Sequence, residues 1–218
     1  VLRSDETVMV QETGASISVT PQTQPQALTV IFLPGAFVDP HAYAPMSHAL
    51  AENGFPTVIL KLPFRAALFA AQEAQVHEQI LTLIQQAPTQ AWVLGGHSRG
   101  GAIAARFAAQ QPDLLSSLVL MGTSLPKVVE DDLSTLPLQV VKLYGTCDGL
   151  ASEAEVLANR RYLPSDARMI RIEGGNHAQF GWYGFQLGDQ TATIARVEQQ
   201  QIILATLLEL FQENKDPR

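Results

Sequence analysis

Residues 91 to 110 read AWVLGGHSRGGAIAARFAAQ, so an apolar run, a glycine-rich stretch and a run of small residues follow one another directly. The order predicts a buried strand over Ala91–Leu94, a turn over Gly95–Gly101 and a helix over Ala102–Gln110. A strand that passes straight into a helix is the unit from which parallel sheets are built.

Ser98 stands at the centre of this turn, with Gly96 and Gly100 two residues away on either side. The spacing is typical of a nucleophile elbow, a strained strand-to-helix turn that raises a serine hydroxyl above the edge of a sheet. Glycine is favoured there because a side chain would collide with the tight backbone. We therefore expect Ser98 to be a nucleophile rather than an ordinary turn residue.

Strands and helices alternate over the rest of the chain. The further strands that we expect are Thr7–Gln11, Ser16–Thr20, Leu28–Leu33, Thr57–Leu62, Ser117–Met121, Leu138–Tyr144 and Arg168–Ile172. The further helices are Ala42–Glu52, Ala71–Gln86, Ser152–Asn159 and Thr193–Phe211. Such alternation predicts an α/β protein with a mostly parallel sheet and helices on both of its faces. The 218 residues fit one domain, 1–218, because no linker or repeat marks a second.

Composition excludes several classes of partner. Lys plus Arg number 14 and Asp plus Glu 21, which gives a net charge of −7 and argues against nucleic acid and anionic membrane surfaces. A single cysteine, Cys147, allows no intrachain disulfide. No apolar run reaches the roughly 18–20 residues of a membrane helix. The sequence leaves the localisation open between the cytoplasm and, if an N-terminal segment before Val1 has been removed, membrane anchoring or export. Its oligomeric state stays open.

A serine nucleophile needs a base, and the base needs an acid that orients it. His177 is the only histidine after Ser98, in a glycine-containing loop behind the last expected strand. Asp148 lies in the turn after the preceding expected strand, where the acid of such a triad belongs. We therefore predict a Ser98–Asp148–His177 triad.

Other residues of the same types have simpler interpretations. We expect no catalytic role for four histidines, of which His97 should pack beneath the nucleophile, and a solvated connection for two acids, while Cys147 should be an inert, at least partly buried thiol. The histidines are His41, His48, His77 and His97, and the acids are Asp131 and Asp132.

Two backbone amides should stabilise the oxyanion that forms during attack. One is the amide of Arg99, directly after the nucleophile. The other should come from the loop behind Leu28–Leu33, where Ala36 is the first candidate and Phe37 the second. The Arg99 side chain has two interpretations, a salt bridge with a nearby acid or a contact to a substrate carboxylate.

Three segments give the whole chain a resemblance to a known family. They are PGAFVDP at residues 34–40, GGHSRGG at 95–101 and GGNHAQFG at 174–181. The chain resembles the small, lidless α/β-hydrolases related to the dienelactone hydrolases, and a bacterial group with these three segments most of all. The resemblance implies the α/β-hydrolase fold and the same triad, and members of the group often carry an N-terminal membrane anchor.

The chain departs from these relatives at two positions. Dienelactone hydrolases proper carry cysteine at the elbow, where this chain has Ser98, and an uncharged residue is commoner at the position of Arg99. The elbow also resembles that of chlorophyllases, although the rest of the chain does not.

The function predicted from these residues is serine-dependent ester hydrolysis, of the carboxylesterase type, through an acyl-enzyme. Two alternatives remain: an acyltransferase or perhydrolase with the same triad, and a non-catalytic relative that binds a small ligand. The connection between the expected strands Ser117–Met121 and Leu138–Tyr144 has about 16 residues, which leaves no room for a large lid. A site without a lid should be shallow and should favour small or soluble esters. No metal cluster or cofactor motif is apparent. Candidate pocket residues are Phe37, Phe64, Leu125, Phe180, Trp182 and Tyr183.

Overall fold

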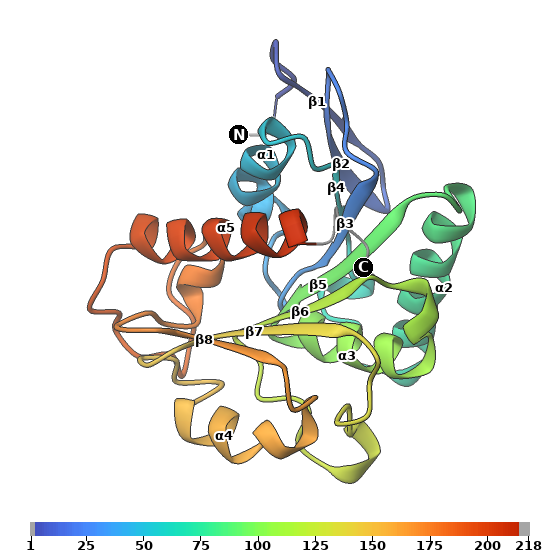
Figure 1. Ribbon diagram of the computed structural model, residues 1–218. Helices are drawn as coiled ribbons and strands as arrows, with labels where there is room; N and C mark the ends of the chain where they lie inside the picture. The colour runs from blue at the N-terminus through green and yellow to red at the C-terminus, as the bar shows by residue number, and fades with distance from the viewer. Residues whose placement is uncertain (1–2, 214–218) are drawn as a thin grey trace.

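The computed structural model describes residues 3–213 and contains an eight-stranded sheet flanked by helices (Figure 1). The strands are β1 Val8–Glu12, β2 Ser16–Pro21, β3 Leu28–Leu33, β4 Thr57–Leu60, β5 Ala91–His97, β6 Ser117–Met121, β7 Gln139–Gly145 and β8 Arg168–Ile172. They lie in the order β1-β2-β4-β3-β5-β6-β7-β8. β2 runs antiparallel to both of its neighbours, β1 and β4, and all other pairs are parallel, so the predicted mostly parallel sheet is confirmed.

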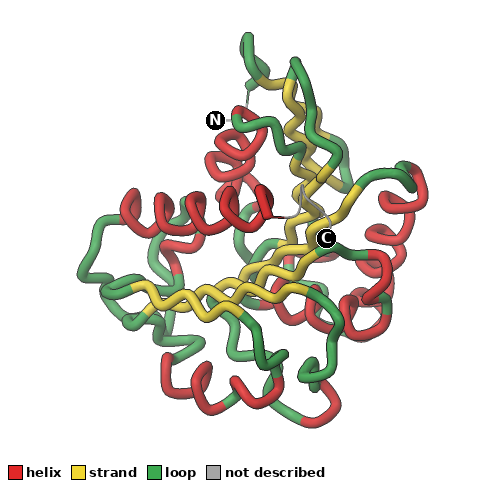
Figure 2. The backbone as a smooth tube through the Cα atoms, viewed as in Figure 1, coloured by secondary structure: helices red, strands yellow, loops and turns green. Residues whose placement is uncertain are grey.

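Five α-helices lie in the described part of the chain, on both faces of the sheet (Figure 2). They are α1 Ala44–Glu52, α2 Ala70–Gln86, α3 Arg99–Gln110, α4 Glu153–Ala158 and α5 Arg196–Glu213. Single turns of 3₁₀ helix occur at η1 Pro40–Tyr43, η2 Pro63–Arg65, η3 Pro112–Leu114, η4 Val129–Asp131, η5 Arg160–Tyr162 and η6 Ala178–Phe180.

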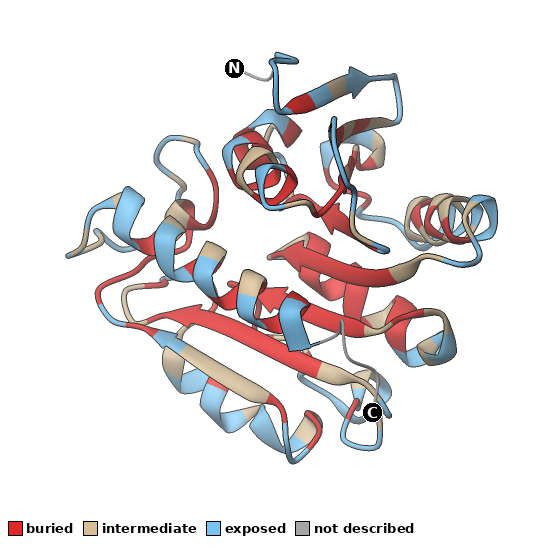
Figure 3. Ribbon diagram, turned by 45° about the horizontal axis from the view of Figure 1, so that its top comes forward, coloured by how far each residue is buried: buried red, intermediate tan, exposed pale blue. Residues whose placement is uncertain are grey.

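Two apolar layers hold the helices against the sheet. One face packs against α1 and α5, for example through Leu50 and Leu207. The other packs against α2 and α3, for example through Ile80 and Phe107. The central strands are buried along their length, while the outer surfaces of the helices are exposed (Figure 3). The strands read as continuous apolar runs because both faces of the sheet are covered.

The structure differs from the sequence prediction around the elbow. β5 extends to His97 and α3 begins at Arg99, whereas the predicted helix begins at Ala102. Ser98 is the single residue between β5 and α3. Gly100 and Gly101, which disfavour a helix when judged from sequence, lie in the first turn of α3. The final helix begins at Arg196, later than the predicted Thr193.

The loops that follow the carboxyl ends of the parallel strands share one edge of the sheet, which is where such folds bind ligands. The connection from β6 to β7 contains only η4, so the expected absence of a large lid agrees with the structure. No helix within residues 3–213 is long and apolar enough to cross a membrane.

Candidate active site

Ser98 occupies a strained turn between β5 and α3. Its φ of 52° and ψ of −116° lie in a region that residues other than glycine rarely adopt. A Cβ atom on Gly96 would lie 2.3 Å from the carbonyl carbon of Gly100, and one on Gly100 would lie 2.1 Å from the Leu33 oxygen. Gly96 is therefore required by the close approach of the first turn of α3, and Gly100 by the close packing of that turn on β3.

Asp148 and His177 form a buried pair, each with 1% of its surface exposed. The Nδ1 atom of His177 lies 2.9 Å from Oδ2 and 3.1 Å from Oδ1 of Asp148. Oδ1 also accepts hydrogen bonds from the amides of Leu150, at 2.8 Å, and Ala151, at 2.7 Å. These contacts fix the carboxylate beside Nδ1 and leave Nε2 as the ring nitrogen that faces away from Asp148.

The three residues of the predicted triad follow three strands at the same edge of the sheet: Ser98 follows β5, Asp148 follows β7 and His177 follows β8. The His177 ring lies 4.5 Å, centroid to centroid, from the ring of His97, the residue before Ser98. Among residues 3–213, Nε2 of His177 has no hydrogen-bond partner, the Ser98 hydroxyl included. Catalytic hydrogen bonds often tighten only when substrate binds.

A buried hydrogen-bond chain runs from the loop after β3 to the elbow. The Gly35 amide donates to the Tyr43 hydroxyl at 3.0 Å, and that hydroxyl lies 2.8 Å from Nδ1 of His97. Because the hydroxyl accepts from Gly35, its own proton points to His97. Burial, and then the neighbouring His177, hold the pKa of His97 well below its usual range, so this ring is neutral. His97 thus packs beneath the nucleophile, as expected, and also links it to the loop that contains Ala36.

Two amides near Ser98 remain free to bind an oxyanion. In the described part of the chain, no group accepts a hydrogen bond from the amide of Ala36, and Arg99 is the first residue of α3, where helical amides have no partner within the helix. The amide of Phe37 instead donates to the Arg65 carbonyl at 2.7 Å. The geometry therefore favours Ala36 over Phe37.

The Arg99 side chain turns away from the serine toward the segment before α2. Its Nη2 lies 2.7 Å from Oε2 of Glu73 and also donates to the Ala67 carbonyl, while Nε lies 3.4 Å from the Ala66 oxygen. Only 19% of the side chain is exposed. Of the two interpretations, the salt bridge is therefore the one present in the structure, and the guanidinium also fixes the loop after β4.

Two side chains that were not identified from the sequence fix the loops containing Asp148 and His177. One Asp189 oxygen accepts from the amides of His177, at 3.2 Å, and Gly149, at 3.1 Å, and the other accepts from Ala178 at 2.8 Å. The buried Gln199 of α5 binds both the amide and the carbonyl of Asn176, at 3.0 and 2.9 Å. No sequence signal marks either residue, because each acts on backbone that is distant along the chain.

The candidate pocket residues do not form one group. Phe37 and Phe64 are exposed and line the same cavity. Phe180 is buried and stacks on His97, with 5.4 Å between ring centroids, so it supports the site from the core. Tyr183 donates to Gln186 at 2.8 Å.

The two remaining candidates lie apart from these. Trp182 is half-exposed, with the Arg196 guanidinium 6.0 Å from the centre of its ring. The Leu125 carbonyl accepts a hydrogen bond from Lys142.

The other titratable residues lie outside the Asp148–His177 pair. His41 pairs with Asp39 and Glu12, His48 with Asp5, and His77 packs against Phe107. Asp132 is exposed, as expected, but Asp131 binds Arg106 at 3.0 Å and is only 12% exposed, because that ion pair draws it toward α3.

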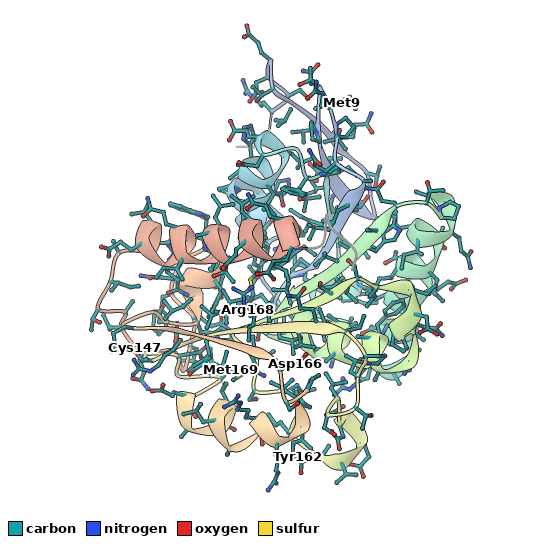
Figure 4. All side chains as sticks on the ribbon, in the orientation of Figure 1. Met9, Cys147, Tyr162, Asp166, Arg168 and Met169 are labelled. Atoms are coloured by element: carbon teal, nitrogen blue, oxygen red, sulfur yellow. The ribbon has the colours of Figure 1, made fainter. Side chains whose placement is uncertain are left out.

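Cys147 is half-buried at the end of β7 that leads to Asp148 (Figure 4). Within residues 3–213, no cluster of three or more His, Cys, Asp or Glu side chains has the arrangement of a metal site.

Comparison with known proteins gives the same fold. Residues 29–201 match the model of the alpha/beta hydrolase family. No curated protein matches the sequence significantly. An alpha-beta serine hydrolase homologue from Coxiella burnetii superposes with a TM-score of 0.68 at 13% identity, covering 95% of this chain and 100% of that one.

Two further structures extend the comparison. A dienelactone-hydrolase-like protein from Klebsiella pneumoniae gives 0.66 at 18% identity, covering 91% and 97% of the two chains. A monoacylglycerol lipase from Paleococcus ferrophilus gives 0.69 at 14%, covering 90% and 99%.

Proposed function

This chain belongs to the alpha/beta hydrolase family, and we propose that it is a serine hydrolase that cleaves carboxylic esters of small or soluble substrates. The proposal is carried by one arrangement: a serine on a strained, glycine-bounded turn, at the same sheet edge as a histidine whose Nδ1 is held by a buried carboxylate. Each part meets a chemical need of acyl transfer, since a serine hydroxyl is a weak nucleophile without a positioned base.

The first half of the reaction forms the acyl-enzyme. His177 Nε2 takes the proton of Ser98 as Oγ attacks the ester carbonyl carbon, and Asp148 stabilises the resulting imidazolium. The carbonyl oxygen becomes an oxyanion that accepts hydrogen bonds from the amides of Ala36 and Arg99. The bond from carbon to the alcohol oxygen then breaks, and His177 returns its proton to the departing alcohol.

The second half releases the acid. Water attacks the Ser98 ester while His177 takes one of its protons, a second oxyanion forms in the same place, and its collapse returns the proton to Oγ.

Ser98→Ala tests the central claim. We expect kcat on p-nitrophenyl acetate and butyrate to fall by at least about 10⁴-fold, as for other triads that lose the nucleophile. A fluorophosphonate probe should label the native protein on Ser98 and leave the variant unlabelled. Ser134→Ala is the matched control, because Ser134 is exposed in the β6–β7 connection.

The outcomes separate the alternatives. Full activity in Ser98→Ala would remove Ser98 from the mechanism. A native protein that neither reacts with the probe nor cleaves any ester would be a ligand-binding relative. Product analysis with added methanol or hydrogen peroxide distinguishes hydrolysis from acyl transfer to another acceptor.

A further inference from the structure

An apolar cavity of about 240 Å³ opens at the surface beside the proposed oxyanion loop. Its lining consists of Phe37, Phe64, Ala66, Leu68, Phe69 and Gln72. Four of these side chains are large, apolar and exposed, with 84% of Phe64 and 70% of Phe69 accessible to solvent. Contiguous apolar surface of this kind on a soluble protein commonly marks a binding site.

The cavity lies at the same edge of the sheet as Ser98. Phe37 belongs to the loop after β3, and the remaining lining residues follow β4. β3 is the direct neighbour of β5, which ends in the elbow, and β4 is the next strand beyond it. Phe37 directly follows Ala36, so one end of the cavity lies a single residue from a proposed oxyanion donor.

The walls of the cavity are held in an unusual backbone conformation. Phe37, Phe64, Arg65 and Ala67 all have positive φ, from 47° to 62°, although none is glycine. Such residues cost energy and persist only where their surroundings fix them. Here the Phe37 amide bonds to Arg65, and Arg99 binds the carbonyls of Ala66 and Ala67, so the residue after the nucleophile holds the cavity wall.

The proposed mechanism determines which part of an ester faces this cavity. The alcohol oxygen must lie against His177, which returns a proton to it, and His177 follows β8 on one side of β5. With the carbonyl oxygen on the amides of Ala36 and Arg99, the remaining substituent, the acyl group, points toward β3 and β4. We propose that the cavity binds the acyl group of the substrate, an apolar chain or ring of about six to eight carbons.

The expected length of the acyl group follows from the volume of the cavity. A volume of 240 Å³ holds about eight groups the size of a water molecule, and a methylene group is of similar size. The proposal rests on the proposed function, since it assigns the acyl side of the same site. Arg99, which is bound to Glu73, leaves the apolar lining without a free cation, so neutral acyl groups fit better than carboxylated ones.

Two series of esters test the proposal, each below the critical micelle concentration. In the first, p-nitrophenyl is fixed and the acyl chain grows from two to ten carbons. In the second, acetyl is fixed and the alcohol grows. In the acyl series we expect kcat/KM to rise about fourfold per methylene, the gain from burying each group, up to six to eight carbons. In the alcohol series we expect kcat/KM to change little.

Phe64→Ser and Phe69→Ser should each lower the octanoyl-to-acetyl ratio of kcat/KM by about tenfold. Phe69→Ser should fold well, because Phe69 is the N-cap of α2 and serine is favoured there. Phe185→Ser is the matched control: this phenylalanine is also 84% exposed, but it follows β8 and lines no part of the cavity.

Several results would overturn the proposal. One is an unchanged ratio in both cavity variants, and another is a loss that appears in the alcohol series instead. A chain-length gain seen only above the critical micelle concentration would mean that the aromatic side chains bind aggregates rather than single acyl groups. A protein that cleaves no ester and takes no probe fails at the proposed function, and the acyl assignment falls with it.

Discussion

Tyr43 shows how one hydroxyl organises the site. It joins the Gly35 amide to His97 Nδ1, and both atoms are buried, so each depends on this hydroxyl for its hydrogen bond. Burial raises the pKa of Tyr43 well above its usual range, which keeps its proton available to His97. The residue therefore fixes the loop after β3, which contains the proposed oxyanion donor Ala36, relative to the elbow.

Tyr43→Phe should lower the free energy of unfolding by about 2 kcal/mol, because two buried polar groups lose their partner while the ring packing on Phe32 remains. We also expect kcat to fall more than KM rises, since the Ala36 amide acts on the oxyanion and not on the bound ester. Urea unfolding and steady-state kinetics measure the two effects.

Tyr162→Phe serves as the control, since its exposed hydroxyl accepts a hydrogen bond from the neighbouring Arg161 in the segment after α4 (Figure 4). An unaltered urea midpoint in Tyr43→Phe would contradict the role of the hydrogen-bond chain.

At the scale of the elements, the sequence predicts what local pattern determines. The strand Leu28–Leu33 is predicted with its observed bounds because an apolar run ends at Pro34-Gly35. Chain order and turn position also single out Asp148 and His177, which the structure brings within 3 Å of each other. In contrast, the start of α3 is predicted too late, because glycine disfavours helices in general while close packing of Gly100 on β3 requires it here.

Contacts between distant segments are the part that the sequence does not reveal. Asp189 binds the amide of Gly149, forty residues earlier, and Gln199 binds Asn176, twenty-three residues earlier. Gln199 belongs to no sequence motif that would mark its role. The role becomes visible only in the structure, where α5 packs beside the loop that contains Asn176 and His177. The orientation of Arg99 toward Glu73 is of the same kind.

Asp189→Asn tests whether one carboxylate fixes the loops after β7 and β8. Its two oxygens accept from four amides of these loops, and an isosteric Asn amide would place an NH₂ group against one set of N–H donors. We expect kcat to fall by about 10- to 100-fold, the equivalent of one charge-assisted hydrogen bond, with KM little changed.

Stopped assays on p-nitrophenyl butyrate measure the change. Asp132→Asn, at an exposed carboxylate that accepts from Ser134, should behave as the native enzyme. Equal kcat in the two variants would show that Asp189 does not position the triad.

At the scale of the whole molecule, the sheet encloses a buried lysine. Lys142 lies in β7 with 1% of its surface exposed, and its Nζ donates to the Leu125 carbonyl. No carboxylate pairs with it among residues 3–213. Burial, assisted by the charge of Lys127, lowers the pKa of Lys142 to about 7, so the folded protein loses this proton at a pH where the unfolded chain keeps it.

The sign of the effect on stability follows from this difference. Between about pH 7 and the ordinary lysine pKa near 10.4, the unfolded chain binds one proton more than the folded chain. Stability therefore rises with pH across that window, by at most about 1.4 kcal/mol per pH unit, and the full cost of burying the charge is present below pH 7.

Lys142→Met should remove this slope, because methionine fills a similar volume and does not titrate. We expect the variant to be more stable than the native protein at pH 6, and the advantage to shrink by about 2–3 kcal/mol by pH 9 as the native lysine becomes neutral. Urea unfolding at pH 6, 7.5 and 9 measures the difference.

Lys61→Met provides the reference, since that amine pairs with Glu12 near the surface and should leave the slope as it is. A constant difference between Lys142→Met and the native protein over this range would mean that Lys142 stays charged in the folded molecule, and that the Leu125 carbonyl compensates for its burial.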